Sequence, residues 1–163
     1  YITYLMQHEK KKICVAAYRL TDREIAQELI NAYNRGVDVE IVADASALEG
    51  RYSKLLCLMR HGIPIYVFPP LPSLDEDGDN QESTIPRSAL MHNKYMVFES
   101  NGIVWTGSFN FTAAARRDNQ ENVGVLHDVQ QAKRYARHFS MLKERSTVLV
   151  RALSRMLQAL PVG

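Results

Sequence analysis

Three short apolar runs alternate with two helical patterns between residues 13 and 68, and this order constrains the fold more than any other feature. The apolar runs cover residues 13–18, 37–44 and 63–68, and the helical patterns cover residues 21–36 and 52–61. Successive strands joined through a helix connect by right-handed crossovers and lie parallel. The sequence therefore predicts an α/β fold, with a mixed, largely parallel β-sheet flanked by helices on both faces.

The first helical pattern carries its own start and stop signals. Thr21 and Glu24 have the spacing of a capping box, in which Thr21 accepts hydrogen bonds from first-turn amides. Gly36 follows the last periodic residue and predicts the end of the helix. The next strand ends at Asp44, and ligands of such sheets gather at the carboxyl ends of the strands.

The 163 residues fit one domain, with two additions to its compact part. Residues from about 69 to 89 lack periodic apolar positions and predict a mobile acidic loop. Residues from about 128 to 160 predict a helical extension with a break near Ser146–Thr147. Because the chain opens at Tyr1 without a methionine, we expect it to be a fragment of a larger protein.

The charge is unevenly distributed along the chain. The formal net charge is +2, but five acidic residues lie between Asp75 and Glu82. The rest of the chain holds 20 basic and 13 acidic residues, a balance of +7. A basic body with one acidic loop suits a polyanionic partner, either nucleic acid or anionic lipid. One hypothesis for the loop is that it shields the basic surface.

A hairpin is predicted where Asn101-Gly102 joins two apolar runs. A two-residue turn would place Phe98 opposite Trp105 and Lys94 opposite Phe109. Because side chains alternate between the two faces of a strand, a slip of one residue would reverse which side chains share a face.

Five residues with polar or permissive chemistry meet on this hairpin. His92 and Lys94 are two apart and point to the same side, and the returning strand brings Gly107, Ser108 and Asn110 beside them. Imidazole is a nucleophile and proton carrier, lysine offers charge to a phosphoryl oxygen, and Gly107 allows close approach of a substrate. No carboxylate cluster with metal-ligand spacing accompanies them. We therefore expect phosphate chemistry without a metal or another cofactor.

These segments resemble the signature of the phospholipase D superfamily. The resemblance rests on HNKYMVFE (92–99) and GSFNFT (107–112), and the downstream NQENV (119–123) is similar to the family's glutamate segment. The likeness extends over residues 13–142 and is to the small single-motif members, which are compact bacterial endonucleases and mitochondrial cardiolipin hydrolases of the Zucchini type.

The resemblance implies a phospholipase D-like fold and a role for each matching residue. His92 matches the nucleophile that forms a phosphohistidine intermediate, and Lys94 matches the ligand of non-bridging phosphate oxygens. Ser108 and Asn110 match supporting phosphate contacts. Glu121 matches the carboxylate that orients a His92 ring and raises its basicity.

Two features of the motif bear on how the site is assembled. Glu99 stands where the family usually has aspartate, and seven rather than six residues separate it from Gly107, so we expect Glu99 only to support the site. The chain has one motif and no internal repeat, whereas the family's chemistry uses two histidines. The resemblance therefore implies a symmetric homodimer, in which the second His92 acts as general acid and base.

Three functions remain open from the sequence. The first is an endonuclease acting on DNA or RNA, with Arg116 and Arg117 as nucleic-acid contacts. The second is a phospholipase acting on cardiolipin or a similar lipid phosphodiester, with an apolar entrance between residues 66 and 74. The third is a non-catalytic nucleic-acid-binding module of a larger protein, against which the intact His92, Lys94 and Glu121 argue.

Overall fold

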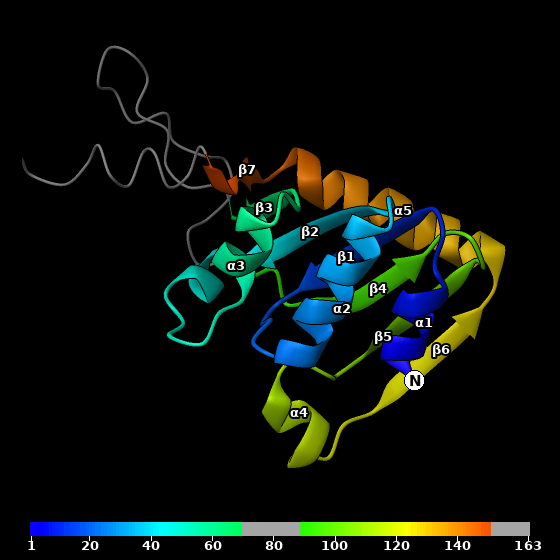
Figure 1. The fold of residues 1–163 in the computed structure, drawn as a ribbon, viewed down its shortest axis with the longest axis horizontal. Coiled ribbons are helices and arrows are strands. Elements are labelled where there is room, and N and C mark those ends of the chain that lie inside the picture. The colour runs from blue at the N-terminus through cyan, green and yellow to red at the C-terminus, as the bar shows by residue number, and fades with distance from the viewer. Residues whose placement is uncertain (70–88, 151–163) are drawn as a thin grey trace, which may run out of the picture.

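A seven-stranded sheet forms the centre of the computed structural model, which describes residues 1–69 and 89–150. The strand order is β6-β5-β4-β1-β2-β3-β7 (Figure 1). Strands β1, β2 and β3 are parallel, and the other pairings are antiparallel. The strand bounds are β1 Lys12–Ala17, β2 Asp38–Asp44, β3 Ile65–Phe68, β4 Lys94–Phe98, β5 Ile103–Gly107, β6 Val123–His127 and β7 Thr147–Val148.

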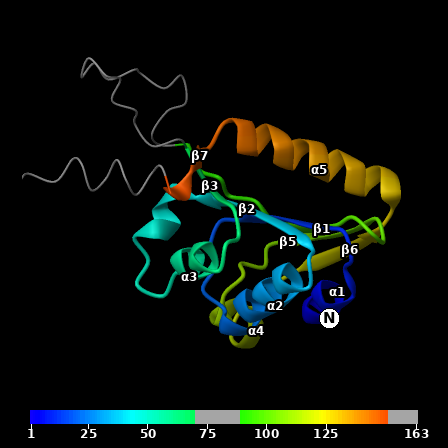
Figure 2. The same cartoon turned by 45° about the horizontal axis from the view of Figure 1, so that its top comes forward.

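Helices cover both faces of this sheet, which confirms the predicted α/β class with a mixed sheet. The sheet is not largely parallel, however, because only two of the six strand pairings are parallel. Helix α5 lies along one face, and α1, α2 and α3 lie on the other (Figure 2). Helix α4 lies beyond one end of the sheet (Figure 1). The bounds are α1 Ile2–His8, α2 Arg23–Asn34, α3 Leu55–Arg60, α4 Ala113–Arg117 and α5 Val129–Glu144, with a 3₁₀ helix, η1, at Ala45–Leu48.

The start of α2 differs from the prediction. Asp22, not Thr21, caps the helix, since its carboxylate accepts hydrogen bonds from the amides of Glu24 at 2.8 Å and Ile25 at 3.1 Å. The Thr21 amide instead donates to the carbonyl of Phe111. This tertiary contact continues the bridge between Leu20 and Phe111 and holds Thr21 outside the helix. A local capping pattern could not anticipate it.

The β4–β5 hairpin forms as predicted, but its register is shifted by two residues. Phe98 pairs with Ile103, so the turn has four residues, not two. The predicted partners of Phe98 and Lys94 were therefore wrong. The amide of Ser100 in the turn donates to the Glu9 carboxylate at 3.1 Å, a contact from the start of the chain. Because side chains alternate along a strand, a shift of two residues keeps every side chain on its predicted face.

The C-terminal part is helical up to the predicted break. Helix α5 is capped by Asp128 and ends at Glu144. After the break, Thr147 and Val148 form β7 against β3, where the sequence had predicted helix. The predicted acidic loop lies almost entirely outside the described residues, and so does the end of the predicted extension.

The core has two halves, one on each face of the sheet. Strand β1 is buried throughout its apolar part and contributes to both. Ile13 and Val15 belong to the half under α1, α2 and α3, and Cys14 and Ala16 belong to the half under α5. Strand β4 lies beside β1, so the segment that carries His92 and Lys94 is attached to a strand that is buried from its second residue onward.

Candidate active site

The predicted hairpin residues lie at the end of the sheet where the parallel strands finish. Lys94 begins β4 and pairs with Ala17, the last residue of β1. Asp44, at the end of β2, is buried and accepts a hydrogen bond from the amide of Met91 at 2.8 Å. The site therefore occupies the carboxyl ends of β1 and β2, where the strand pattern predicted ligand binding.

Six of the predicted residues line one pocket of about 450 Å³. The lining residues are His92, Asn93, Lys94, Thr106, Gly107, Ser108, Asn110 and Glu121. They come from the start of β4 and the segment before it, the end of β5 and the segment after it, and the segment before β6. The predicted hairpin had grouped five of these six residues, and the family resemblance had added Glu121.

The imidazole of His92 is exposed to solvent and packs on one side against an aromatic ring. The ring centroids of His92 and Tyr18 are 4.5 Å apart and the planes are inclined by 59°. The backbone on both sides of His92 is anchored, because Met91 bonds to Asp44 and the carbonyl of Asn93 accepts from the Tyr18 amide at 3.0 Å. The imidazole is thus held in place without being buried.

Lys94 is buried, with 7% of its surface exposed. Its Nζ donates to the carbonyl of His92 at 2.6 Å and lies 4.9 Å from the centre of the Tyr18 ring. Among the described residues, no carboxylate lies within ion-pair distance of Lys94. Burial lowers the pKa of Lys94 below its ordinary value, and the more distant charge of Glu121 partly opposes this. The pocket therefore holds a positive charge that lacks an anionic partner.

Glu121 lies across the pocket and is held by polar neighbours. Its carboxylate accepts hydrogen bonds from the Ser108 hydroxyl and, at 2.9 Å, from the Asn119 amide. These bonds lower the pKa of Glu121, so the carboxylate remains ionised near neutral pH. The hydroxyl of Ser108 also accepts from the amide of Asn122 at 3.1 Å. In this arrangement Ser108 positions Glu121, in addition to lining the pocket.

Gly107 and Asn110 have different structural reasons for their places. A Cβ atom on Gly107 would lie 2.1 Å from the carbonyl oxygen of Asn122, so the close approach of β5 and β6 requires glycine. The sequence had explained this glycine by substrate access. The Oδ1 atom of Asn110 is buried and has no hydrogen-bond partner among the described residues. A buried polar atom beside a pocket is a candidate ligand contact.

Three predicted residues lie away from this pocket. Glu99 is exposed in the hairpin turn, at the opposite end of β4 from His92. Arg116 of α4 forms ion pairs with Glu24 and, at 3.1 Å, with Asp22. Arg117 is exposed on α4 and lines a different pocket.

Sequence reasoning missed two residues that shape the site. Tyr18 contacts both His92 and Lys94, yet in the sequence it is only the last residue of an apolar run. The role of Asp44 was partly visible, because its place at the end of a strand indicated the correct end of the sheet. Its bond to Met91 joins positions 47 apart in the sequence, which no local pattern reveals.

Among the described residues, no group of three or more His, Cys, Asp or Glu side chains could hold a metal ion. The pocket itself contains one histidine and one carboxylate, which is fewer than protein zinc sites use.

Comparisons with known proteins show which family this chain is similar to. A family model described as "Cardiolipin synthase, PLD-like domain" matches residues 2–143. A phospholipase D from Rickettsia typhi is 32% identical over 148 residues, covering 91% of this chain and 64% of the relative. A mitochondrial cardiolipin hydrolase from Chlamydomonas reinhardtii is 27% identical over 130 residues, covering 80% of this chain and 49% of the relative.

A solved structure is also similar. The phospholipase D family member Nuc from Salmonella typhimurium has a TM-score of 0.71 and 29% sequence identity, with 90% of this chain and 87% of that chain covered. The chain spans less than two thirds of the length of the curated relatives named above. The match of the family model over residues 2–143 shows that this chain belongs to the phospholipase D superfamily.

Proposed function

We propose that the chain is a phosphodiesterase that cleaves nucleic acid through a phosphohistidine intermediate on His92. The observation that carries the proposal is the pairing, in one pocket, of an exposed and anchored imidazole with a buried ammonium group that lacks an anionic partner. A phosphodiester supplies both what the imidazole attacks and the negative charge that Lys94 lacks.

The reaction follows from these positions. A nitrogen of His92 attacks phosphorus, the N–P bond forms, and the P–O bond to the leaving group breaks. Lys94 neutralises the charge on the non-bridging oxygens, and the Nδ2 group of Asn110, which lines the same pocket, can donate a hydrogen bond to them. Water then forms a new P–O bond as the N–P bond breaks, which regenerates the imidazole. Glu121, held ionised by Ser108 and Asn119, stabilises imidazolium electrostatically.

Protonation of the leaving oxygen requires a second acid. The pocket contains one histidine, so we propose a symmetric homodimer in which the partner's His92 donates this proton and later accepts one from water. Mixed dimers of wild-type and His92→Ala chains are then inactive. Full activity of isolated monomers at high dilution would contradict the two-histidine mechanism.

The basic balance of the chain outside its acidic stretch suits nucleic acid as the substrate, although an anionic lipid would meet the same charge. A lipid phosphodiester is the second candidate, and a specific observation favours it: the relatives above bear the names phospholipase D and mitochondrial cardiolipin hydrolase. In the described part of the chain, no helix has the length and apolar character needed to cross a bilayer.

One assay separates these functions. The protein is incubated with labelled single-stranded DNA, RNA and cardiolipin vesicles, each in excess chelator, beside the variants His92→Ala and His61→Ala. His61 is an exposed histidine at the end of α3 and serves as the matched control. The proposal predicts strand cleavage that survives the chelator, is lost in His92→Ala and is retained in His61→Ala. Acid-labile phosphate trapped on wild-type protein would identify the intermediate.

The other outcomes are informative as well. Cleavage of lipid alone would support the second candidate, and loss of all cleavage in chelator would contradict a mechanism without metal. Salt-sensitive binding of strands without any turnover would mean that the chain is a non-catalytic nucleic-acid-binding module.

A further inference from the structure

A second pocket, of about 360 Å³, lies between the start of α2, the loop after η1 and helix α4. Cations line it, and they differ in their pairing. Arg116 is neutralised by Asp22 and Glu24, as described above. Arg23, Lys54 and Arg117 also line the pocket, and they make no ion pair among the described residues. We call this pocket, whose lining includes Thr21, Arg23, Tyr52, Lys54, Thr112 and Arg117, the basic pocket.

The basic pocket lies close along the chain to the pocket that contains His92, which we call the catalytic pocket. Asn110 lines the catalytic pocket and Thr112 lines the basic pocket. Two residues of extended chain span at most about 7 Å between Cα atoms. A strand whose scissile phosphate lies beside His92 can therefore reach the basic pocket with a neighbouring phosphate.

A second connection runs through stacked cations and rings. Tyr18, which packs on His92, has the guanidinium of Arg19 at 5.1 Å from its ring centre. A terminal nitrogen of Arg19 lies 4.0 Å from the position of a Cβ atom at Gly50. Gly50 opens the loop that carries Arg51, Tyr52 and Lys54. Tyr18, Arg19 and the loop after Gly50 thus lie in succession between His92 and the basic pocket.

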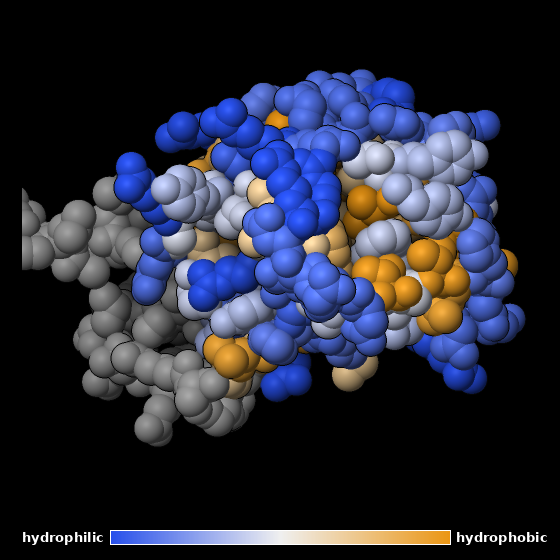
Figure 3. Space-filling view, turned by 90° about the horizontal axis from the view of Figure 1, so that it is seen from below, coloured by the Kyte–Doolittle hydropathy of each residue, from blue (hydrophilic) through white to orange (hydrophobic). Residues whose placement is uncertain are grey.

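Tyr52, in the loop after Gly50, is largely exposed. It is 68% exposed, and its ring centre lies 5.6 Å from the guanidinium carbon of Arg51. Figure 3 shows the side of the molecule on which α4 lies, where hydrophilic residues form a broad band across the surface. An exposed aromatic ring among unpaired cations is the combination that binds single-stranded nucleic acid, since bases stack on the ring and cations contact the backbone.

We propose that the basic pocket and Tyr52 form a second binding site for single-stranded nucleic acid. Lys54, Arg23 and Arg117 hold a phosphate next to the scissile one, and Tyr52 stacks on a base between them. This inference rests on the proposed function and names its substrate class. Repeated phosphates and flat bases distinguish such a strand from a lipid headgroup, which has no base to stack on the exposed ring.

The site is tested first by binding, in chains that carry His92→Ala so that cleavage does not interfere. The probe is a labelled single strand of about 12 nucleotides, a length within the usual site sizes. Changing Lys54 and Arg117 to alanine should weaken binding about tenfold and reduce the slope of log affinity against log salt by about 0.7 for each cation removed. Tyr52→Ala should weaken binding about fivefold or more.

The controls are Lys11→Ala and Arg60→Ala, which remove exposed cations at the start of β1 and the end of α3, outside both pockets. The second arm uses chains with intact His92 and compares the strand with bis(p-nitrophenyl) phosphate, a diester too short to reach the basic pocket. The Lys54 and Arg117 changes should raise KM for the strand several-fold more than KM for the small diester.

Each result decides between the site and the function on which it rests. Strand affinity and salt slope equal to those of the control variants, with wild-type cleavage of strands present, would overturn the second site and leave the proposed function intact. Failure of the wild-type protein to cleave either substrate would overturn the proposed function, while the binding arm would still decide the site. Weakened binding to cardiolipin vesicles, with unchanged strand binding, would overturn the assignment to nucleic acid.

Discussion

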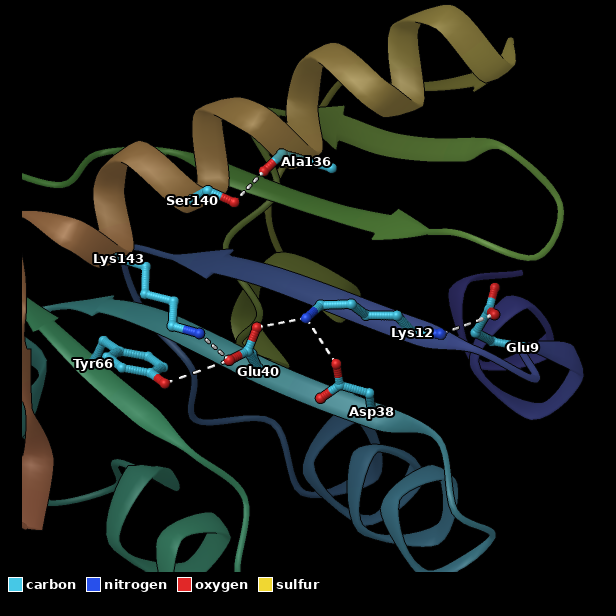
Figure 4. A network of polar contacts seen from close by, with 8 residues as sticks. All are labelled: Glu9, Lys12, Asp38, Glu40, Tyr66, Ala136, Ser140 and Lys143. Carbon is cyan, nitrogen blue, oxygen red and sulfur yellow. Dashed lines mark hydrogen bonds and ion pairs between the residues drawn. The ribbon is translucent and has the colours of Figure 1, made fainter.

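Lysines lie near both ends of strand β1, and their charges are compensated in opposite ways. At its start, the Nζ atom of Lys12 lies 2.7 Å from carboxylate oxygens of both Asp38 and Glu40, and Lys143 of α5 also binds Glu40 (Figure 4). Near its end, Lys94 is bonded to a backbone carbonyl and faces a tyrosine ring. We call the first group the Glu40 cluster.

The ionisation of the lysines reflects this difference. Burial lowers the pKa of Lys12, but hydrogen bonds to Asp38 and Glu40 outweigh it and the net shift is upward; Lys143 is raised in the same way. Burial lowers the pKa of Lys94, and no bonded carboxylate compensates. The comparison teaches that a paired charge contributes to folding, whereas an unpaired one is stabilised only when an anion arrives.

The largest expected effect comes from removing the unpaired charge. Lys94→Met should lower kcat/KM for phosphodiester cleavage about 10³-fold, because phosphate oxygens lose their cation. The same change should raise the free energy of unfolding by about 1 kcal/mol, because a desolvated charge is replaced by an apolar chain of similar size. Steady-state kinetics and urea denaturation measure the two effects. If Lys94→Met lowered the free energy of unfolding as much as Lys143→Met does, the contrast between the unpaired and the paired lysine would disappear.

The paired cluster should respond in the opposite way. Glu40→Gln leaves two lysines facing a neutral amide, and we expect a loss of about 2 kcal/mol in the free energy of unfolding, since Glu40 is buried and its lysines are partly exposed. Urea denaturation checks this, with Asp38→Asn as the control at the more exposed carboxylate. An equal effect of the two substitutions would show that Glu40 has no special place in the cluster.

A smaller effect is expected from the anchor behind His92. The Asp44 carboxylate accepts hydrogen bonds from the Met91 amide and, at 2.5 Å, from the Ser46 hydroxyl. In Asp44→Asn, one of these two donors must face an amide NH₂, which cannot accept a hydrogen bond. Since this loosens the backbone before His92, we expect kcat to fall about tenfold, while KM changes less. A change in KM alone would mean that Asp44 acts on substrate binding and not on the position of the imidazole.

The smallest effect concerns pH. Hydrogen bonds from Lys12 and Lys143 outweigh burial and lower the pKa of Glu40 below its ordinary 4.5. A lowered carboxyl pKa contributes stability that is present above the unfolded value and is lost as pH falls through the folded value. The difference in stability between the wild type and Glu40→Gln should therefore shrink as pH falls below 4.5. Urea denaturation at pH 7 and pH 3 tests this, and a difference that grows on acidification would reverse the assigned sign.

Patterns within short segments predicted much of this molecule. The alternation of apolar runs and helical periods gave the parallel arrangement of β1, β2 and β3, since that order allows few other topologies. The spacing of His92 and Lys94 placed both in one pocket because a strand repeats every two residues. The same parity explains why a wrong turn length did not disturb the predicted face.

The failures all involve contacts between distant segments. Phe111 holds Thr21 out of α2, and Glu9 fixes Ser100 in the turn. Arg116 was expected to contact nucleic acid, yet its partners Asp22 and Glu24 lie about 90 residues earlier in the chain. Such pairings depend on the completed fold, so no window of neighbouring residues contains them.

The narrow crossing at Gly107 has a consequence for how this protein can be damaged. Any side chain there collides with the carbonyl of Asn122, and one of the two strands must yield. Strand β6 lies at the edge of the sheet and pairs only with β5, so we expect β6 to move away from β5 while the central strands stay in place. Glu121, just ahead of it, would be carried along. We expect a substitution at Gly107 to give a folded but inactive protein, a defect that a screen of melting temperature would not detect.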